Sequence, residues 1–132
     1  MGTKCGRRSA EGQLVNIRVG QGFDIHRFNT EPTPGRALIL GGEVFDGMRS
    51  LVGHSDADVI AHAVADALLG AAGLGDIGQH FPDTDARWKN ANSLELLAEV
   101  ARMVAAEGWT IGNVDCSVVC EEPKLAPRRE AL

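Results

Sequence analysis

The sequence contains no tyrosine, and aromatic residues make up only 5% of its 132 positions. Any core must therefore be built mainly from aliphatic side chains. No stretch is long and apolar enough to resemble a membrane span, so a membrane partner is not expected. The start of the chain holds Lys4, Arg7 and Arg8 but no apolar block, which excludes a secretory signal of the usual kind.

Basic side chains are fewer than acidic ones. There are 13 Lys and Arg against 18 Asp and Glu, which gives a net charge of −5. This balance argues against nucleic acid as a partner and fits a soluble cytoplasmic protein. We expect a bacterial cytoplasm, with a plastid as the alternative.

The sequence has only three cysteines, and their spacing does not suggest pairing. Cys5, Cys116 and Cys120 are odd in number and lack C-x-x-C spacing, which favours a reducing compartment over a disulfide framework. Cys116 and Cys120 fall on the same face of a predicted strand. We interpret them as small buried hydrophobic residues rather than as metal ligands or redox groups.

Hydrophobic residues make up 44% of the chain, enough for one globular domain. We expect residues 1–13 to be a disordered extension and residues 14–132 to be the domain. Alternation and turn residues predict strands at 15–19 and 114–120 and a hairpin of 37–40 with 43–45. Apolar spacing predicts helices at 55–72 and 93–107, and Pro127 suits the first turn of another. The fold class is therefore α+β, with helices packed on one face of a sheet.

The boundaries of the first helix have clear signals. Ser55 is a natural N-cap, and Asp58 three residues later completes an acidic variant of the capping box. Gly73 and Gly75 end the helix. The polar segment 75–92 that follows is long for an unstructured loop in so small a domain, and such loops tend to carry function.

Histidines and aspartates cluster in the first two thirds of the chain. Asp24 and His26 are two residues apart, which places both side chains on one face of an extended segment. His62 lies within the first predicted helix, and Asp58 and Asp66 flank it four residues away on the same face. Two imidazoles and a carboxylate with an open fourth position are typical of a catalytic zinc site, and either flanking aspartate could orient the His62 ring.

Three further features leave alternatives open. His54 and Ser55 precede a helix start, where free N–H groups suit a phosphate, although Ser55 could serve only as a cap. The acidic loop around Asp83 and Asp85 could hold a diol or could merely be solvated. Lys124 could meet a phosphate or be an ordinary surface lysine.

These segments together resemble the 2-C-methyl-D-erythritol 2,4-cyclodiphosphate synthase family. The most diagnostic block is residues 53–63, GHSDADVIAHA, preceded by residues 20–28, GQGFDIHRF. Further matching blocks follow in the family's order: residues 66–72, 75–78, 81–85, 113–115 and 123–125. The resemblance runs from about Ile17 to Pro127.

The resemblance implies a ferredoxin-like subunit, an α/β sandwich with a mixed sheet, in a homotrimer whose active sites lie between subunits. The implied reaction converts 4-diphosphocytidyl-2-C-methyl-D-erythritol 2-phosphate to 2-C-methyl-D-erythritol 2,4-cyclodiphosphate and releases CMP. It is a phosphorus–oxygen lyase step of non-mevalonate isoprenoid precursor synthesis, with a small-molecule substrate, no nucleic acid and no membrane.

The resemblance also implies roles for residues. Asp24, His26 and His62 bind one Zn²⁺ per active site, and Mg²⁺ or Mn²⁺ lies on the substrate diphosphate. His54 is catalytic and, with Ser55, contacts the substrate phosphate. Asp76, followed by Ile77 and Gly78, holds the erythritol hydroxyls. The other implied substrate-binding residues are Asp24, His26, Phe81, Pro82, Asp83, Thr84, Asp85, Cys120, Pro123, Lys124, Leu125 and Ala126.

The resemblance has a gap, because the family continues with a helix, a strand and a second helix that we expect the domain 14–132 to lack. That segment carries a Thr-Thr pair and a glutamate that helps hold the second metal. The alternative function is therefore a truncated, inactive paralogue that binds only metal or nucleotide. The ligand set alone also allows a non-haem Fe(II) oxygenase, but the order Asp-x-His and a helical third ligand disfavour it.

Overall fold

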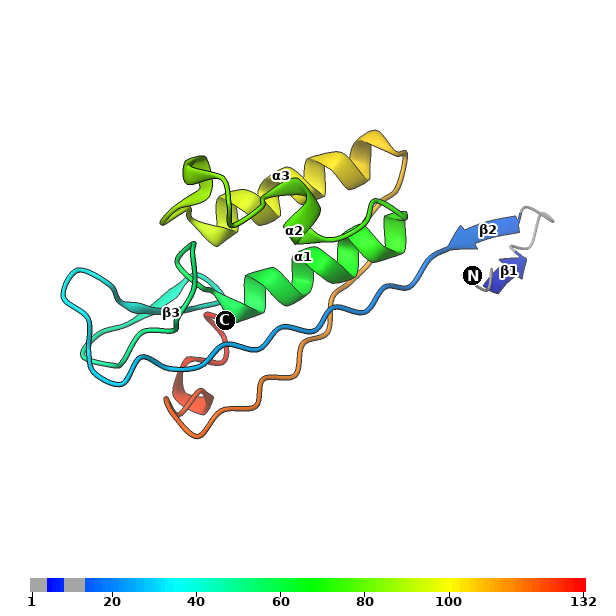
Figure 1. Ribbon diagram of the computed structural model, residues 1–132. Helices are drawn as coiled ribbons and strands as arrows, with labels where there is room; N and C mark the ends of the chain where they lie inside the picture. The colour runs from blue at the N-terminus through cyan, green and yellow to red at the C-terminus, as the bar shows by residue number, and fades with distance from the viewer. Residues whose placement is uncertain (1–4, 9–13) are drawn as a thin grey trace.

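The computed structural model describes residues 5–8 and 14–132, and its elements run from blue to red in Figure 1. They are β1 (Cys5–Arg8), β2 (Leu14–Ile17), β3 (Leu38–Leu40), β4 (Glu43–Phe45), α1 (Val59–Ala72), α2 (Ile77–His80), the 3-10 helix η1 (Ala86–Trp88), α3 (Ser93–Ala106) and the 3-10 helix η2 (Ala126–Arg128). The extension expected at residues 1–13 lies largely outside the described residues. Of that extension, the structure describes only β1, which pairs antiparallel with β2.

Strands and helices are both present, so the α+β class is confirmed. The described strands form two separate two-stranded antiparallel sheets, β1 with β2 and β3 with β4, and no mixed sheet. The hairpin was predicted correctly, with Leu38 opposite Phe45 and Leu40 opposite Glu43. None of the helices in the described part of the chain has the length and apolar character needed to cross a bilayer.

The core has two parts that meet at α1. The first packs the hairpin against the segment before α1 and includes Leu38, Phe45 and Leu51. The second lies between α1 and α3, where Leu69 and Val100 are fully buried. Figure 1 shows α1 between α3 on one side and two extended segments on the other, one after β2 and one after α3.

Helix α1 begins later than expected. Its N-cap is Asp58, not Ser55, and the Asp58 carboxylate accepts hydrogen bonds from the backbone N–H groups of Ile60 and Ala61. The Ser55 hydroxyl instead accepts from the N–H of Ala57, 3.1 Å away, in a tight turn before the helix. The predicted end at Gly73 is confirmed, since Gly73 caps α1 in the left-handed conformation.

The prediction of a paired strand at residues 114–120 was wrong. The segment is extended in Figure 1, but none of it belongs to a strand. Alternating apolar residues favour an extended conformation, but a strand forms only where a neighbour accepts its backbone hydrogen bonds. Cys116 and Cys120 are consequently exposed, not buried as interpreted above.

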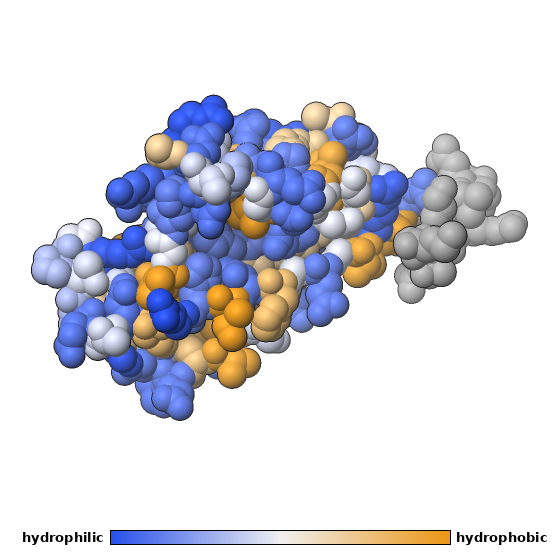
Figure 2. All heavy atoms as spheres, viewed as in Figure 1, coloured by the Kyte–Doolittle hydropathy of each residue, from blue (hydrophilic) through white to orange (hydrophobic). Residues whose placement is uncertain are grey.

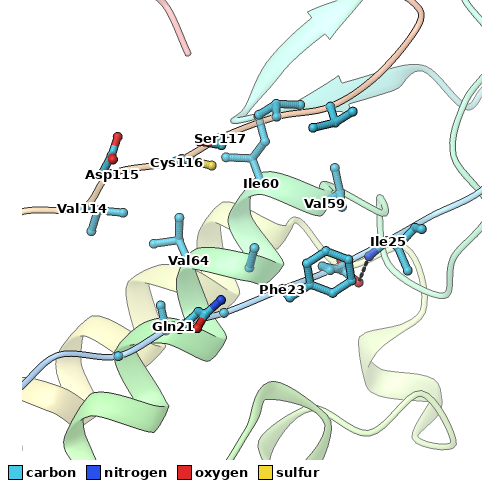
Figure 3. A pocket seen from close by; sticks show the side chains of 17 residues that line it. Gln21, Phe23, Ile25, Val59, Ile60, Val64, Val114, Asp115, Cys116 and Ser117 are labelled. Atoms are coloured by element: carbon cyan, nitrogen blue, oxygen red, sulfur yellow. Dashed lines mark hydrogen bonds between the residues drawn. The ribbon is translucent and has the colours of Figure 1, made fainter.

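An apolar groove of about 420 Å³ lies over α1, between residues 20–25 and residues 114–119. Figure 3 shows Val59, Ile60 and Val64 forming its floor, with Phe23 and Val114 at its two sides. In Figure 2, hydrophobic surface follows the extended segment that leaves β2. Phe23 is 77% exposed and Val119 is 98% exposed, so large apolar side chains on this face are open to solvent.

The buried Asp58 carboxylate joins the hairpin to α1. It accepts from the N–H groups of Gly41 and Gly42, at 2.8 and 2.7 Å, in addition to the two at the helix start. Asp58 is 0% exposed, so water cannot replace these bonds. We expect Asp58→Ala to lower the free energy of unfolding by roughly 3–5 kcal/mol, because a cap is lost and buried N–H groups are left without acceptors.

Chemical denaturation of the two proteins measures this difference. The exposed Asp46 provides the control, and Asp46→Ala should change the free energy of unfolding by less than about 0.5 kcal/mol. Equal effects of the two substitutions would contradict the structural role of Asp58.

Candidate metal centre and adjoining pocket

Asp24 and His26 are presented by the extended segment after β2. Residues 21–28 alternate strictly between exposed and partly buried, with Asp24 and His26 on the inward side. The segment lies against the backbone of α1, and a Cβ atom at Gly20 or Gly22 would be 1.8 Å from the carbonyl oxygens of Ala67 or Ala63. Only glycine permits this close approach, which brings the two ligand-type side chains up to the helix.

His62 comes from the first turn of α1, where its N–H donates to the carbonyl of Asp58 at 3.0 Å. The Asp24 Oδ2 atom lies 3.0 Å from His26 Nε2 and 3.1 Å from His62 Nδ1. One ligand atom from each residue lies within 4.8 Å of the other two. The three side chains predicted to converge therefore do so.

Burial works to raise the pKa of Asp24, but the hydrogen bonds and charge of His26 and His62 outweigh it and hold that pKa well below its ordinary value. The hydrogen bond to Asp24 raises the pKa of His26 against the opposing effect of burial, and the carbonyl of Val52 adds to the increase. The site thus favours a negative Asp24 surrounded by positive charge, whether that charge is a proton or a metal ion.

The hydrogen bond behind His26 fits a metal centre. His26 Nδ1 lies 2.6 Å from the carbonyl oxygen of Val52, which can only accept, so Nδ1 carries the hydrogen. A neutral His26 then directs the lone pair of Nε2 towards the Asp24 carboxylate. Two such electron-rich atoms at 3.0 Å repel each other unless a cation lies between or beside them. Two imidazoles and one carboxylate match the three protein ligands of a catalytic zinc.

A pocket of about 240 Å³ adjoins this centre. Several of the predicted substrate-binding residues line it together with His26 and His62: His54, Ser55, Ile77, Phe81 and Asp83. The His54 ring is partly buried, with Nε2 3.3 Å from the carbonyl oxygen of Asp85. Its position beside the candidate metal ligands places an imidazole where an anion in the pocket would meet it.

Other predicted residues have local roles in the structure. Asp76 is exposed and caps α2, accepting from the N–H of Gln79 at 3.0 Å. Asp85 caps η1 and pairs with Arg87, whose hydrogen bonds lower the pKa of Asp85. Neither residue lines the pocket, and neither do Gly78, Pro82 and Thr84.

Residues 120–126 lie away from this pocket. Lys124 and Cys120 are exposed, Glu122 pairs with Arg49, and Leu125 packs against the hairpin cluster. Within one copy of the described chain, the predicted nucleotide-binding segment therefore does not adjoin the metal centre.

The prediction that Asp58 or Asp66 orients the His62 ring was wrong. Asp58 caps α1, and Asp66 accepts from the N–H of Ile77 at 2.7 Å. The structure places Ser93 and Ser55 against His62 instead, with their hydroxyls 2.8 and 3.1 Å from Nε2. Helical spacing identified the flanking aspartates, but no local signal indicates that the start of α3 reaches His62.

The fold and site define an α+β protein with a candidate centre for a metal ion beside a pocket of about 240 Å³. The chain belongs to the YgbB family, which it matches over residues 17–132.

Among its relatives, it is 56% identical over 111 residues to the 2-C-methyl-D-erythritol 2,4-cyclodiphosphate synthase of Enterococcus faecalis, covering 84% of this chain and 68% of the relative. It is 55% identical over 116 residues to a bifunctional IspD/IspF enzyme of Anaeromyxobacter dehalogenans, covering 88% of this chain and 29% of that protein. The chain thus spans less than a third of the length of the bifunctional relative.

A solved structure, the CDP complex of IspF from Plasmodium falciparum, is 34% identical with a TM-score of 0.70 and covers 86% of this chain and 67% of that one. This agreement supports the fold. The CDP belongs to that protein's structure.

Without metal, the Asp24–His26 pair makes stability depend on pH. Because the pKa of His26 is raised by folding, its contribution is fully present below the ordinary value of 6.5 and is lost as the pH rises through the raised pKa. Because the pKa of Asp24 is lowered, its contribution is present above 3.8 and is lost as the pH falls. We expect the Tm of EDTA-treated protein to be highest between about pH 4 and 6.5.

Added Zn²⁺ should extend this stability to higher pH, because the metal replaces the proton and binds only the folded site. Thermal unfolding with EDTA and with Zn²⁺ tests both statements. Asp24→Asn should flatten the profile and abolish the effect of zinc. Superimposable profiles for wild type with and without zinc would contradict a metal centre here.

Proposed function

We propose that this chain converts 4-diphosphocytidyl-2-C-methyl-D-erythritol 2-phosphate to 2-C-methyl-D-erythritol 2,4-cyclodiphosphate with release of CMP, as a phosphorus–oxygen lyase of isoprenoid precursor synthesis. The observation that carries the proposal is the convergence of Asp24, His26 and His62 beside a pocket lined by His54 and Ser55. The names of the relatives in its family support the same reaction.

The chemistry suits these residues. The attacking 2-phosphate is already an anion at neutral pH, so no strong base is required. The difficulty is to bring two anions together in line, and orientation of this kind contributes roughly 7–11 kcal/mol. A Zn²⁺ held by Asp24, His26 and His62 would supply positive charge to a phosphate oxygen, and Mg²⁺ or Mn²⁺ would do so on the diphosphate.

The chain's own residues then position the substrate. His54 lies at the pocket wall, where its Nε2–H, which donates to the carbonyl of Asp85 at 3.3 Å, would turn to an oxygen of the phosphate being attacked. The Ser55 hydroxyl faces the same pocket. We propose that Asp76, Ile77 and Gly78, with residues 81–85, hold the methylerythritol part. Residues 120–126 would bind the cytidine diphosphate, and since they lie apart from this pocket in one copy, they would do so at the site of a neighbouring subunit in a homotrimer.

We further propose that the groove over α1 accepts another β-strand, which would complete a ferredoxin-like mixed sheet in the domain 14–132. The support is local. The groove is apolar, and residues 19–24 and 113–120 on its two sides make no backbone–backbone hydrogen bonds in the described structure. The acidic charge and the bacterial relatives fit action in a bacterial cytoplasm, with the plastid as the alternative.

Release of CMP from the diphosphocytidyl substrate, measured with Zn²⁺ and Mn²⁺ present, tests the reaction. We expect His54→Asn to reduce turnover by roughly 10²–10³-fold, because it removes one donor to developing negative charge. His80 is the matched control, since its Nε2 atom contacts the carbonyl of Leu74 outside the pocket. His80→Asn should leave turnover within about twofold of wild type.

The outcomes separate the two functions considered. If folded wild-type protein binds zinc or CDP but releases no CMP, the chain is a binding module. If His54→Asn and His80→Asn have equal turnover, the proposed role of His54 is wrong.

A further inference from the structure

His62 contacts α3 through the ring nitrogen that does not face Asp24. Its Nε2 atom lies 2.8 Å from the hydroxyl of Ser93, the first residue of α3. Ser93 is 1% exposed, and its hydroxyl also contacts the carboxylate of Asp56. A continuous hydrogen-bonded chain therefore runs from Asp56 through Ser93 to His62.

Asp56 fixes the direction of the hydrogen bonds that link it through Ser93 to His62. The ionised carboxylate only accepts, and two backbone donors already point to it: the N–H of Ser93 at 3.0 Å and that of Asp58 at 3.1 Å. The Ser93 hydroxyl must therefore donate its single hydrogen to Asp56. The oxygen of Ser93 is then left as an acceptor. The Ser55 hydroxyl, 3.1 Å from the same His62 nitrogen, can donate to this oxygen at 3.4 Å, so the hydrogen on His62 lies on Nε2.

This arrangement leaves the Nδ1 atom of His62 without a hydrogen, directed at Asp24 from 3.1 Å. His26 is held in the opposite tautomer, since the carbonyl of Val52 keeps the hydrogen on Nδ1 and frees Nε2. Each imidazole thus offers a lone pair to the same point. Two different backbone elements enforce this, the segment before α1 for His26 and the start of α3 for His62.

Ser93 does not owe its position to helix capping. Asn92 is the N-cap of α3 and accepts from the N–H of Leu94 at 2.9 Å. The loop before α3 is tied separately to the segment before α1, through Asp56 N–H to the carbonyl of Ala91 at 3.0 Å and Asn90 N–H to that of His54 at 2.8 Å. The hydroxyl of Ser93 is therefore not used to cap α3, and it can accept a hydrogen bond from His62.

We propose that Ser93 and Asp56 are positioning residues that select the His62 tautomer able to bind a metal ion through Nδ1. This inference rests on the proposed metal centre. Neither residue is one of the three candidate ligands or lines the adjoining pocket, and both would act through the orientation and protonation of the His62 ring.

The test is the zinc affinity of the whole chain, measured by competition with a chromophoric chelator. We expect Ser93→Ala to weaken zinc binding by roughly 10–100-fold, as for other supporting partners of metal-bound histidines. Asp56→Asn should weaken it similarly, because an amide can donate and so allows the Ser93 hydroxyl to turn towards Nε2. The double variant should be no weaker than either single variant, since both remove one chain of bonds.

Val104 provides the control. It is 4% exposed and packs in the core between α1 and α3, in the last turn of the helix that begins with Ser93. Val104→Ala should lower the Tm at least as much as Ser93→Ala but leave zinc affinity unchanged. A Ser93→Ala protein with wild-type affinity, or a Val104→Ala protein weakened as much, would overturn the proposal.

Nitrogen-15 NMR of the imidazoles gives a readout that a purely structural role would not alter. In metal-free protein the Asp24 carboxylate draws the His62 hydrogen to Nδ1 and the Ser93 oxygen draws it to Nε2, so the Nε2–H fraction of the neutral ring should be clearly larger in wild type than in Ser93→Ala or Asp56→Asn. Unchanged tautomers in both variants would overturn the proposed role of Ser93 and Asp56 even if zinc affinity falls. If wild type binds no zinc, the proposed metal centre itself is wrong, and that result is distinguishable from failure of the role of Ser93 and Asp56 alone.

Discussion

The buried carboxylate of Asp58 is the interaction on which the rest of the structure depends. It accepts four backbone hydrogen bonds, two from the β3–β4 turn and two from the first turn of α1. A carboxylate at 0% exposure is stable only when its oxygens are satisfied in this way. By fixing where α1 starts, Asp58 fixes the position of His62 one turn later along the helix. That position decides whether the His62 ring contacts Asp24.

A second constraint comes from the other side of α1. Gly20 and Gly22 allow an extended segment to lie directly on the helix backbone, which a side chain at either position would prevent. Asp24 and His26 continue this segment on the same inward face. The candidate centre is thus assembled from an extended chain and a helix, each placed by its own local contacts, and the charges of the three side chains reinforce one another once together.

The packed seam, the interface between α1 and α3, contains both core residues and residues that contact the candidate metal centre. Leu69 and Val100 bury their side chains there, and the N-terminal end of the same seam brings Ser93 under His62. The pocket with His54 and Ser55 opens beside it. Residues that hold the two helices together and residues that orient a candidate metal ligand are therefore part of one packed unit.

The sequence by itself determined the local features. The hairpin, the end of α1 at Gly73, and the pairing of Asp24 with His26 on one face all follow from spacing and residue type, because each is set within a few residues. The chemical nature of the centre was also predictable, since Asp-x-His and a helical His form a recognisable ligand set.

Only the tertiary structure decided the rest. It assigned Asp58 to capping α1 and Ser55 to a turn, left residues 114–120 without a strand partner, and placed Ser93 and Asp56 behind His62. Each of these depends on contacts between segments far apart in the chain. A carboxylate, a hydroxyl or an alternating strand pattern can be satisfied in several ways, and the partner that satisfies it is chosen by packing.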